Sequence, residues 1–348
     1  MSLDMNGLRA FYGDIRAAVD AEKIPGAVML AGRRGETLFF ESCGCAQWLP
    51  AREPMTKDTS FDVASLSKMT GAWPEILLLL QEGRLSLTDT MADMLGERPM
   101  HPDLWDVTLW NLLTHTAGLV PFHQPAEFGE SREARVNGLL SLPPVKPRGA
   151  QVLYSDLSFI FLGEILSKYA GKPLDQAAGE IFKRLGMDHT GYNPTPDTYC
   201  AATEFRPGRT DYPVRGTVHD ETSEMLGGVA GHAGVFSTAE DLGRFLTAII
   251  PDDPNPLFER DWLLRSFTNQ TGHLGDTRAL GWICYRIRPE GNIVGHTGFT
   301  GTSMWLDTAT GEYVVLLTNR VHPTRNNDTL FPLRREGFRK VFGVGIMM

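Results

Sequence analysis

Runs with a β-like pattern lie at both ends of the chain and enclose a mainly helical middle, and this order most constrains the fold. Two apolar runs at 27–32 and 37–42 predict a hairpin, because the residues between them, 33–36, are polar and include glycine. Further β-like runs lie in the last quarter of the chain, at 279–286, 292–296, 302–307 and 313–318. The economical arrangement is one sheet built from both ends, with the helical middle inserted.

Helical periodicity is clearest at the two termini and in the middle of the chain. Apolar residues at 8, 11, 15, 18 and 19 share one helical face and predict an opening helix that ends before Pro25. Further helices are predicted at 157–169, 173–185, 239–250 and 330–342. Pro74 interrupts the helix expected from Ser65 onward, because proline removes a backbone donor and crowds a preceding carbonyl. We expect a kink or break there.

The size and composition of the chain suit two lobes. The chain has 348 residues, of which 42% are hydrophobic, so it can bury a large core. We predict an α+β, multi-domain fold. Residues 1–60 and 232–348 are expected to form a discontinuous α/β sheet domain, and residues 61–231 a mainly helical domain.

The charge pattern bears on partners and compartment. The net charge is −9 and no Lys/Arg cluster occurs, which argues against a nucleic-acid partner. No apolar run is long enough to span a bilayer, and no positively charged segment followed by an apolar one precedes Leu8. We therefore expect a cytoplasmic protein with no integral membrane segment, or else a trimmed form of a periplasmic or secreted one. The sequence leaves the oligomeric state open.

Ser65 and Lys68 lie three residues apart at the expected start of a helix, which sets both side chains on one face. A serine hydroxyl attacks poorly on its own, and a neutral amine within hydrogen-bond reach can take its proton during attack on a carbonyl. The Ser65 backbone N–H, near the helix start, can help to hold the resulting oxyanion. A lone Ser-x-x-Lys match is weak, but two further segments follow it in order: Tyr154-Ser155-Asp156 and His296-Thr297-Gly298.

On these residues the chain resembles the serine β-lactamase and penicillin-binding-protein family, in its branch of class C β-lactamases, D-Ala-D-Ala carboxypeptidases and esterases. Residues 61–68 look like the first motif of that branch, 154–156 like its Tyr-x-Asn motif, and 296–298 like its Lys/His-Thr-Gly motif. Segments 112–119 and 236–242 are also similar to stretches common there. The resemblance implies an antiparallel sheet flanked by terminal helices, with an inserted all-helical lobe.

The resemblance also implies roles for individual residues. Ser65 would be the acylated nucleophile, Lys68 the adjacent base, and Tyr154 the group that relays the proton to the leaving group. The residues expected at the substrate are Asp156, His296, Thr297 and Phe299, the last through its backbone N–H as second oxyanion donor. No metal or organic cofactor is implied.

Two positions depart from the commoner motifs. Asp156 stands where the family usually has asparagine, and an ionised carboxylate near Lys68 favours the charged ammonium over a neutral base. Proton abstraction would then be shared with Tyr154, or Asp156 would be held protonated. His296 stands where many β-lactamases carry lysine. A histidine of ordinary pKa is mostly neutral at pH 7 and grips an anionic substrate less firmly, which weakens a β-lactamase assignment without excluding it.

Other titratable residues have weaker signals. His219, Asp220 and His232 offer metal-ligand types, but their spacing fits no metal motif, and hydrogen-bonded loop or core groups are the favoured interpretation. Their segment looks like stretches in family members that act on peptidoglycan fragments, including muramyl-peptide amidases. His115 is expected to be structural. Free thiols are expected at all four cysteines: Cys43, Cys45, Cys200 and Cys284.

The sequence therefore predicts a serine hydrolase that forms an acyl-enzyme at Ser65 on an ester or amide. The substrate stays open among a D-Ala-D-Ala-type peptide, a muramyl peptide, a β-lactam and a simple acyl ester, because a fold and a nucleophile do not fix specificity. Two alternatives remain: a non-catalytic penicillin- or muramyl-peptide-binding relative, and a metallohydrolase using His219, Asp220 and His232.

Overall fold

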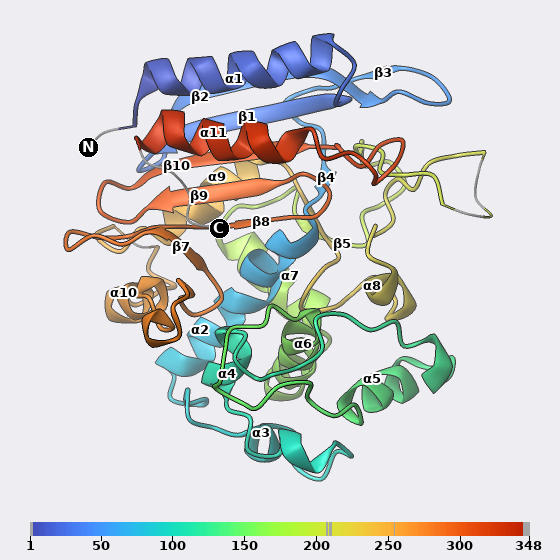
Figure 1. Cartoon of the computed structure of the whole chain (residues 1–348), viewed down its shortest axis with the longest axis vertical. Helices are drawn as coiled ribbons and strands as arrows, with labels where there is room; N and C mark the ends of the chain where they lie inside the picture. Colours follow the sequence, from blue (N-terminus) through green and yellow to red (C-terminus); the bar gives the residue numbers. More distant parts are fainter. Residues whose placement is uncertain (1–2, 207, 209–210, 254, 344–348) are drawn as a thin grey trace.

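A seven-stranded antiparallel sheet forms the upper part of the molecule (Figure 1). The computed structural model describes residues 3–343 except 207, 209, 210 and 254. The strand order across the sheet is β3-β2-β1-β10-β9-β8-β7. The strands are β1 (Gly26–Arg33), β2 (Glu36–Gln47), β3 (Glu53–Pro54), β7 (Ile283–Arg286), β8 (Ile293–Thr297), β9 (Ser303–Asp307) and β10 (Glu312–Thr318). As predicted, the sheet combines both ends of the chain, because β1 pairs with β10 from Ala27 opposite Thr318 to Arg33 opposite Glu312.

The central strand β1 is buried on both faces, which explains its continuous apolar run. Val28 and Leu30 belong to the core shared with the helical part, whereas Ala27, Met29 and Ala31 pack toward the terminal helices. This alternation follows the two-residue period of a strand. The sheet therefore separates two hydrophobic cores.

The terminal helices α1 (Met5–Asp20) and α11 (Leu330–Phe342) lie side by side on the outer face of the sheet (Figure 1). They approach closely at Gly337, where an added Cβ would lie 2.2 Å from the Phe11 ring. The opening and closing helices predicted from periodicity are thus confirmed, with α11 at the predicted bounds.

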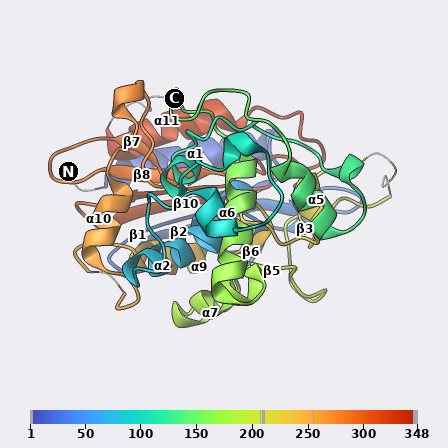
Figure 2. The same cartoon turned by 90° about the horizontal axis from the view of Figure 1, so that it is seen from below.

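The middle of the chain builds the helical part below the inner face of the sheet (Figure 1). Its α-helices are α2 (Trp73–Gln81), α3 (Met91–Leu95), α4 (Leu109–Leu113), α5 (Arg132–Leu140), α6 (Asp156–Ala170), α7 (Leu174–Arg184) and α8 (Glu221–Met225). Helix α6 lies at the centre (Figure 2) and ends where Gly171 adopts a positive φ of 66°. A small sheet of β4 (Phe61–Asp62), β6 (Val235–Ser237) and β5 (Gly191–Tyr192) lies beside these helices. Helices α9 (Ala239–Ala248) and α10 (Arg260–Phe267) follow β6, and α9 packs on β1 and β10.

The helix expected from Ser65 is broken, as Pro74 predicts. A 3₁₀ turn at Ala64–Leu66 is followed by a π-helical stretch at Lys68–Ala72, and α2 begins only at Trp73. Pro74 then sits in the first turn of α2, where its missing N–H costs nothing. Irregular helix at this point places Ser65 and Lys68 outside the ordinary α-helical ladder.

One predicted strand is shorter in the structure. The run 279–286 forms a strand only from Ile283 to Arg286, because Gly281 takes a positive φ of 86° and turns the chain. The domain boundaries at 60 and 231 stay a prediction. Among the described residues, no helix has both the length and the apolar character needed to cross a bilayer.

Candidate active site

Ser65 and Lys68 are in direct contact. The Lys68 ammonium donates to Ser65 Oγ at 3.0 Å, and the lysine side chain is fully buried while Ser65 is partly exposed. Lys68 Nζ also donates to Asp156 Oδ1 at 2.7 Å and to the His232 carbonyl at 3.3 Å. The ammonium is therefore held by three acceptors, of which the predicted nucleophile is one.

The charge state of Lys68 follows from these neighbours. Burial disfavours the ammonium, but the nearby Asp156 and Tyr154 outweigh it and raise the pKa of Lys68 above its ordinary value. An ammonium donates hydrogen bonds and cannot accept the Ser65 proton. The electrostatic effect expected from an aspartate at position 156 is thus present in the structure.

Tyr154 is placed by His115. The two rings lie 4.5 Å apart, the His115 carbonyl accepts from the Leu153 N–H, and His115 Nδ1 accepts from the Ser155 N–H. Burial, followed by the charges of Arg278 and Lys68, holds the pKa of His115 well below its ordinary value, so the ring stays neutral. His115 is structural, as expected, and the loop it supports carries the predicted catalytic tyrosine.

Two cations flank the Tyr154 ring. Lys68 Nζ lies 4.9 Å from the ring centroid, and the Arg278 guanidinium lies 5.3 Å from it. Negative charge that develops on the phenol oxygen during proton transfer is stabilised by such neighbours. Tyr154 therefore lies close to both Lys68 and Arg278.

A second carboxylate lies close to Asp156. Asp156 begins α6, and one ligand atom each of Asp156, Asp220 and His232 lie within 4.8 Å of one another. His232 Nε2 contacts Asp220 Oδ1 at 2.8 Å. Burial opposes ionisation of Asp220, but His232, the Ser223 N–H and Lys68 together lower the pKa of its carboxyl. We call Ser65, Lys68, Asp156, Asp220 and His232 the Lys68 cluster.

The predicted metal trio is not brought together as such. His219 Nε2 contacts Glu204 Oε1 at 3.0 Å, and His219 is not part of the group that Asp220 and His232 form. Asp156, and not His219, forms a group with Asp220 and His232. The buried Lys68 ammonium donates a hydrogen bond to the Asp156 carboxylate. The geometry favours hydrogen-bonded groups at these positions, which is the interpretation preferred from the sequence. All four cysteines are free.

The end of strand β8 touches the nucleophile turn. A Cβ at Gly298 would lie 2.5 Å from the Val63 carbonyl oxygen, so only glycine fits there. The next residue, Phe299, lines the same cavity as Ser65 and Thr297. Among the contacts of the described residues, its backbone N–H has no acceptor and remains available as the predicted oxyanion donor.

His296 is a neutral group in this structure. It is buried and lies 6.1 Å from the Tyr154 ring, and its Nδ1 contacts the Thr297 carbonyl at 2.9 Å. Burial, then Lys68 and Arg278, hold the pKa of His296 well below its ordinary value. Since Nδ1 faces a carbonyl, it carries the proton, and Nε2 is an acceptor without a partner among the described residues.

Arg278 and Arg334 supply the positive charge that His296 lacks. Both line the cavity with Ser65, and no carboxylate of the described residues lies within ion-pair distance of either guanidinium. Arg278 Nη1 is buried without a partner, while Arg334 Nη1 reaches the Thr302 carbonyl at 3.4 Å. Burial lowers the pKa of Arg334. We call His296, Arg278 and Arg334 the His296 cluster. The two arginines were not predicted from the sequence, because an isolated arginine belongs to no recognisable motif.

These residues open onto one cavity of about 580 Å³. Its walls include Ser65, Tyr154, Asp156, Thr297 and Phe299, so the predicted site residues face one space except for the fully buried Lys68 behind Ser65. Exposed aromatic rings border it, at Phe122, Phe299 and Phe331. The arrangement suits acyl transfer, since the predicted nucleophile, the predicted catalytic tyrosine and the predicted oxyanion donors converge at one cavity.

Comparisons with known proteins show the family of this chain and some of its relatives. The profile of the family described as Beta-lactamase matches residues 13–337. An N-acetylmuramyl-L-alanine amidase of Bacillus subtilis (strain 168) is 29% identical over 347 residues, covering 87% of this chain and 78% of that protein. A putative D-alanyl-D-alanine carboxypeptidase of Salmonella paratyphi B is 28% identical over 318 residues, covering 80% of this chain and 73% of that protein.

Solved structures share the fold. A β-lactamase/D-alanine carboxypeptidase from Pseudomonas syringae superposes with a TM-score of 0.76 at 23% identity, covering 95% of this chain and 98% of that one. EstCE1, a hydrolase with promiscuous acyltransferase activity, gives a TM-score of 0.74 at 22% identity, covering 97% of this chain and 99% of that one. At these identities the likeness concerns architecture alone.

Proposed function

The chain belongs to the β-lactamase family of serine hydrolases, and on this premise we propose that it hydrolyses an amide or ester bond of a carboxylate-bearing peptide, with cell-wall peptides as the substrate class. The observation that carries the substrate class is the pair of arginines without carboxylate partners, Arg278 and Arg334, in the cavity that contains Ser65. A cation held in a partly dry site favours an anionic ligand.

The proposed reaction begins with attack of Ser65 Oγ on the carbonyl carbon. Because Lys68 is held as an ammonium, the Ser65 proton passes to the Tyr154 oxygen while the phenol passes its own proton to the leaving group, and Lys68 stabilises the charge that develops on Oγ. The N–H groups of Ser65 and Phe299 hold the oxyanion. The bond between the carbonyl carbon and the leaving nitrogen or oxygen breaks as that atom takes up the relayed proton, and water hydrolyses the ester left on Ser65.

The names of similar proteins support the same substrate class. One is called an N-acetylmuramyl-L-alanine amidase and another a putative D-alanyl-D-alanine carboxypeptidase, and both names describe peptides of cell-wall type. A neutral His296 makes a β-lactam a weaker candidate, because the lysine of many β-lactamases is absent and the charge must come from Arg278 or Arg334.

A panel of substrates tests the proposal. Wild type and Ser65→Ala are assayed with p-nitrophenyl esters, nitrocefin, D-alanyl dipeptides and muramyl dipeptide. We expect turnover of at least one peptide that carries a free carboxylate, and a loss of at least about a thousandfold in Ser65→Ala. Turnover that survives in Ser65→Ala, or stoichiometric binding of a penicillin or muramyl peptide without turnover, would contradict the proposal and favour the non-catalytic relative. Activity abolished by a chelator would favour the metallohydrolase.

A further inference from the structure

The backbone immediately before Ser65 is strained. Ala64 has a φ of +49°, a left-handed conformation that residues with a β-carbon rarely adopt. Ala64 is buried and is the first residue of the 3₁₀ turn that contains Ser65, which lines the cavity. Such a conformation persists only where surrounding contacts impose it.

The side chain of Asp62 is hydrogen-bonded to the strained residue. Its Oδ1 accepts from the Ala64 N–H at 2.8 Å, and its Oδ2 accepts from the His219 N–H at 2.6 Å. The residue is 3% exposed, so neither oxygen is served by solvent. One carboxylate therefore joins the nucleophile turn to the loop that carries His219 and Asp220.

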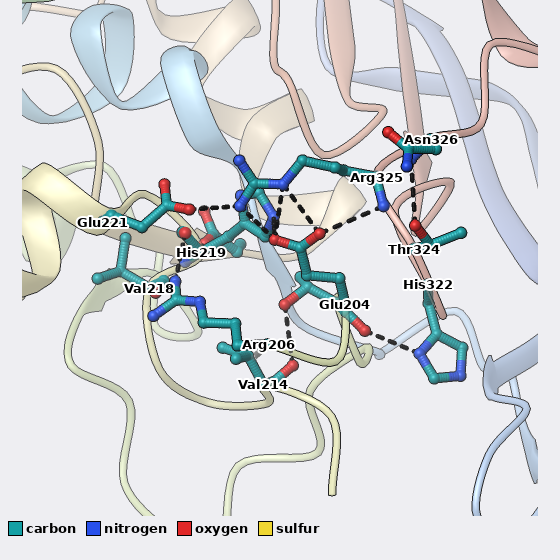
Figure 3. A network of polar contacts seen from close by, with 12 residues as sticks. Glu204, Arg206, Val214, Val218, His219, Glu221, His322, Thr324, Arg325 and Asn326 are labelled. Carbon is teal, nitrogen blue, oxygen red and sulfur yellow. Dashed lines mark hydrogen bonds and ion pairs between the residues drawn. The ribbon is translucent and has the colours of Figure 1, made fainter. Parts of the chain in front are cut away.

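The loop on the other side of Asp62 is itself fixed (Figure 3). Glu204 contacts the His219 ring and receives Arg325 Nε at 2.8 Å, and Arg325 also pairs with Glu221. The His219 ring stacks on Phe299 at 5.6 Å. These contacts fix the loop, and the Asp62 carboxylate connects the loop to Ala64.

The main chain at Asp62 and Val63 is also held from a third element. Thr300 Oγ1 donates to the Asp62 carbonyl at 2.8 Å, and Thr302 Oγ1 donates to the Val63 carbonyl at 2.9 Å. Both threonines follow Phe299, the predicted oxyanion donor. Asp62 therefore lies where the nucleophile turn, the His219 loop and the oxyanion segment meet.

We infer that Asp62 is a positioning residue for acylation: its two hydrogen bonds hold Ala64 in the left-handed conformation that presents Ser65 Oγ to Lys68 and the substrate. The inference rests on the proposed role of Ser65 as the nucleophile. It adds that the strained turn before Ser65 is held by a carboxylate that does not contact the substrate.

The test uses Asp62→Asn, which keeps the shape of the side chain but offers only one acceptor to two N–H donors. The rate constant of Ser65 acylation by a fluorophosphonate is expected to fall about a hundredfold, as a misplaced nucleophile would predict. Acylation at the wild-type rate would overturn the inference. Failure of wild type to acylate at Ser65 would instead overturn the proposed function, which separates the two.

A matched control is Asp241→Asn. Asp241 is equally buried and accepts from the His189 N–H at 2.8 Å and from Thr190 Oγ1 at 2.9 Å, but it does not line the cavity. We expect this variant to lose thermal stability and to retain the wild-type acylation rate. An equal loss of acylation in both variants would mean that Asp62 contributes only to stability, and would overturn the inference.

Rescue by Ala64→Gly gives the sharpest readout. Glycine adopts a φ of +49° without strain, so the double variant Asp62→Asn/Ala64→Gly no longer needs the carboxylate to hold the turn. It should acylate at least about tenfold faster than Asp62→Asn. A double variant no faster than the single one contradicts the inference. If Asp62→Asn does not fold, a folded and acylating double variant supports it, and a double variant that also fails to fold overturns it.

Discussion

The Lys68 cluster and the His296 cluster lie at the same cavity, but positive charge has carboxylate partners in the first and, among the described residues, none in the second. In the Lys68 cluster, a fully buried ammonium lies against Asp156 with Asp220 close by, so the positive charge is compensated. In the His296 cluster, the histidine is neutral and two arginines have no carboxylate partner among the described residues. The first arrangement suits a reaction centre that is complete before substrate arrives. The second suits a site that an anionic ligand completes.

This difference assigns separate tasks to the two clusters. Compensated charge near Ser65 keeps the resting site stable without a ligand, because a buried charge without a partner is costly. Uncompensated charge near Arg278 and Arg334 lowers stability and is tolerated where it gives binding energy. Tyr154 lies next to a cation of each cluster, so the proton relay proposed for it can respond to a bound substrate.

Lys68→Ala should produce the largest effect, because it removes the ammonium that balances the carboxylates of the Lys68 cluster. Asp156 and Asp220 would then face each other without the cation between them. We expect kcat/KM to fall by at least about a thousandfold and the free energy of unfolding to fall by about 3–5 kcal/mol at pH 7. Enzyme assays and urea unfolding measure the two.

Lys168→Ala is the control for that variant. Lys168 lies in the last turn of α6, and its ammonium donates to the Met94 carbonyl at 2.8 Å, with no carboxylate partner in the part of the chain that the structure describes. It should change stability by less than about 1 kcal/mol and leave kcat/KM unchanged. If Lys68→Ala behaves like Lys168→Ala, the first cluster has no special electrostatic role.

Arg278→Gln and Arg334→Gln test the second cluster. A charge-assisted hydrogen bond is worth about 1.5–3 kcal/mol, so each variant should lower kcat/KM about ten- to a hundredfold for a peptide with a free carboxylate. The same peptide with a carboxamide should lose less than about threefold. Arg260→Gln, which removes an exposed arginine paired with Asp252, serves as the control. Equal losses of kcat/KM for the free carboxylate and the carboxamide would contradict the proposal that the arginines of the His296 cluster bind an anionic group.

Asp156→Asn tests whether the carboxylate sets the charge state of Lys68. Without Asp156 the pKa of Lys68 should fall, because the neighbour that favours the ammonium is gone. The alkaline limb of the kcat/KM profile should then move to lower pH, with kcat reduced about tenfold at pH 7. A pH-rate profile and a rate identical to wild type would mean that Asp156 and Lys68 are not coupled in catalysis.

His296→Gln should give the smallest effect, on the pH dependence of stability. The pKa of His296 is lowered by folding, so below pH 6.5 the unfolded chain takes up a proton that the folded chain does not. Stability therefore falls as pH falls through that range. Removing the histidine should flatten the slope by up to about 1.4 kcal/mol per pH unit between pH 6 and 5. Urea unfolding at several pH values measures it, and an unchanged slope would show that His296 is protonated in the folded protein.

The sequence predicted what depends on local pattern. Strand and helix periodicity gave the sheet from both chain ends and the terminal helices, and the proline at position 74 gave the break before α2. Spacing within one helical turn put Ser65 beside Lys68, which the structure shows at 3.0 Å. Motif order placed Tyr154 and His296 at the same cavity.

Contacts between distant segments could not be predicted in the same way. The sequence predicts hydrogen-bonded loop or core groups at Asp220 and His232, and it does not show their neighbour Asp156, which lies far away in the sequence and belongs to another motif. The arginines at 278 and 334 are two among 33 basic residues, and only folding shows that they lack partners. The role proposed for Asp62 depends on the positive φ of Ala64, which no pattern of residues in the sequence predicts.

The most direct test of the account is to locate the acyl group. Wild-type protein is treated with a fluorophosphonate, and separately with a penicillin, and is then digested and examined by mass spectrometry. The account predicts one equivalent of the fluorophosphonate adduct on the peptide that contains Ser65, with no adduct in Ser65→Ala. A modified peptide without Ser65, or no covalent adduct with any acyl donor that the protein turns over, would contradict it.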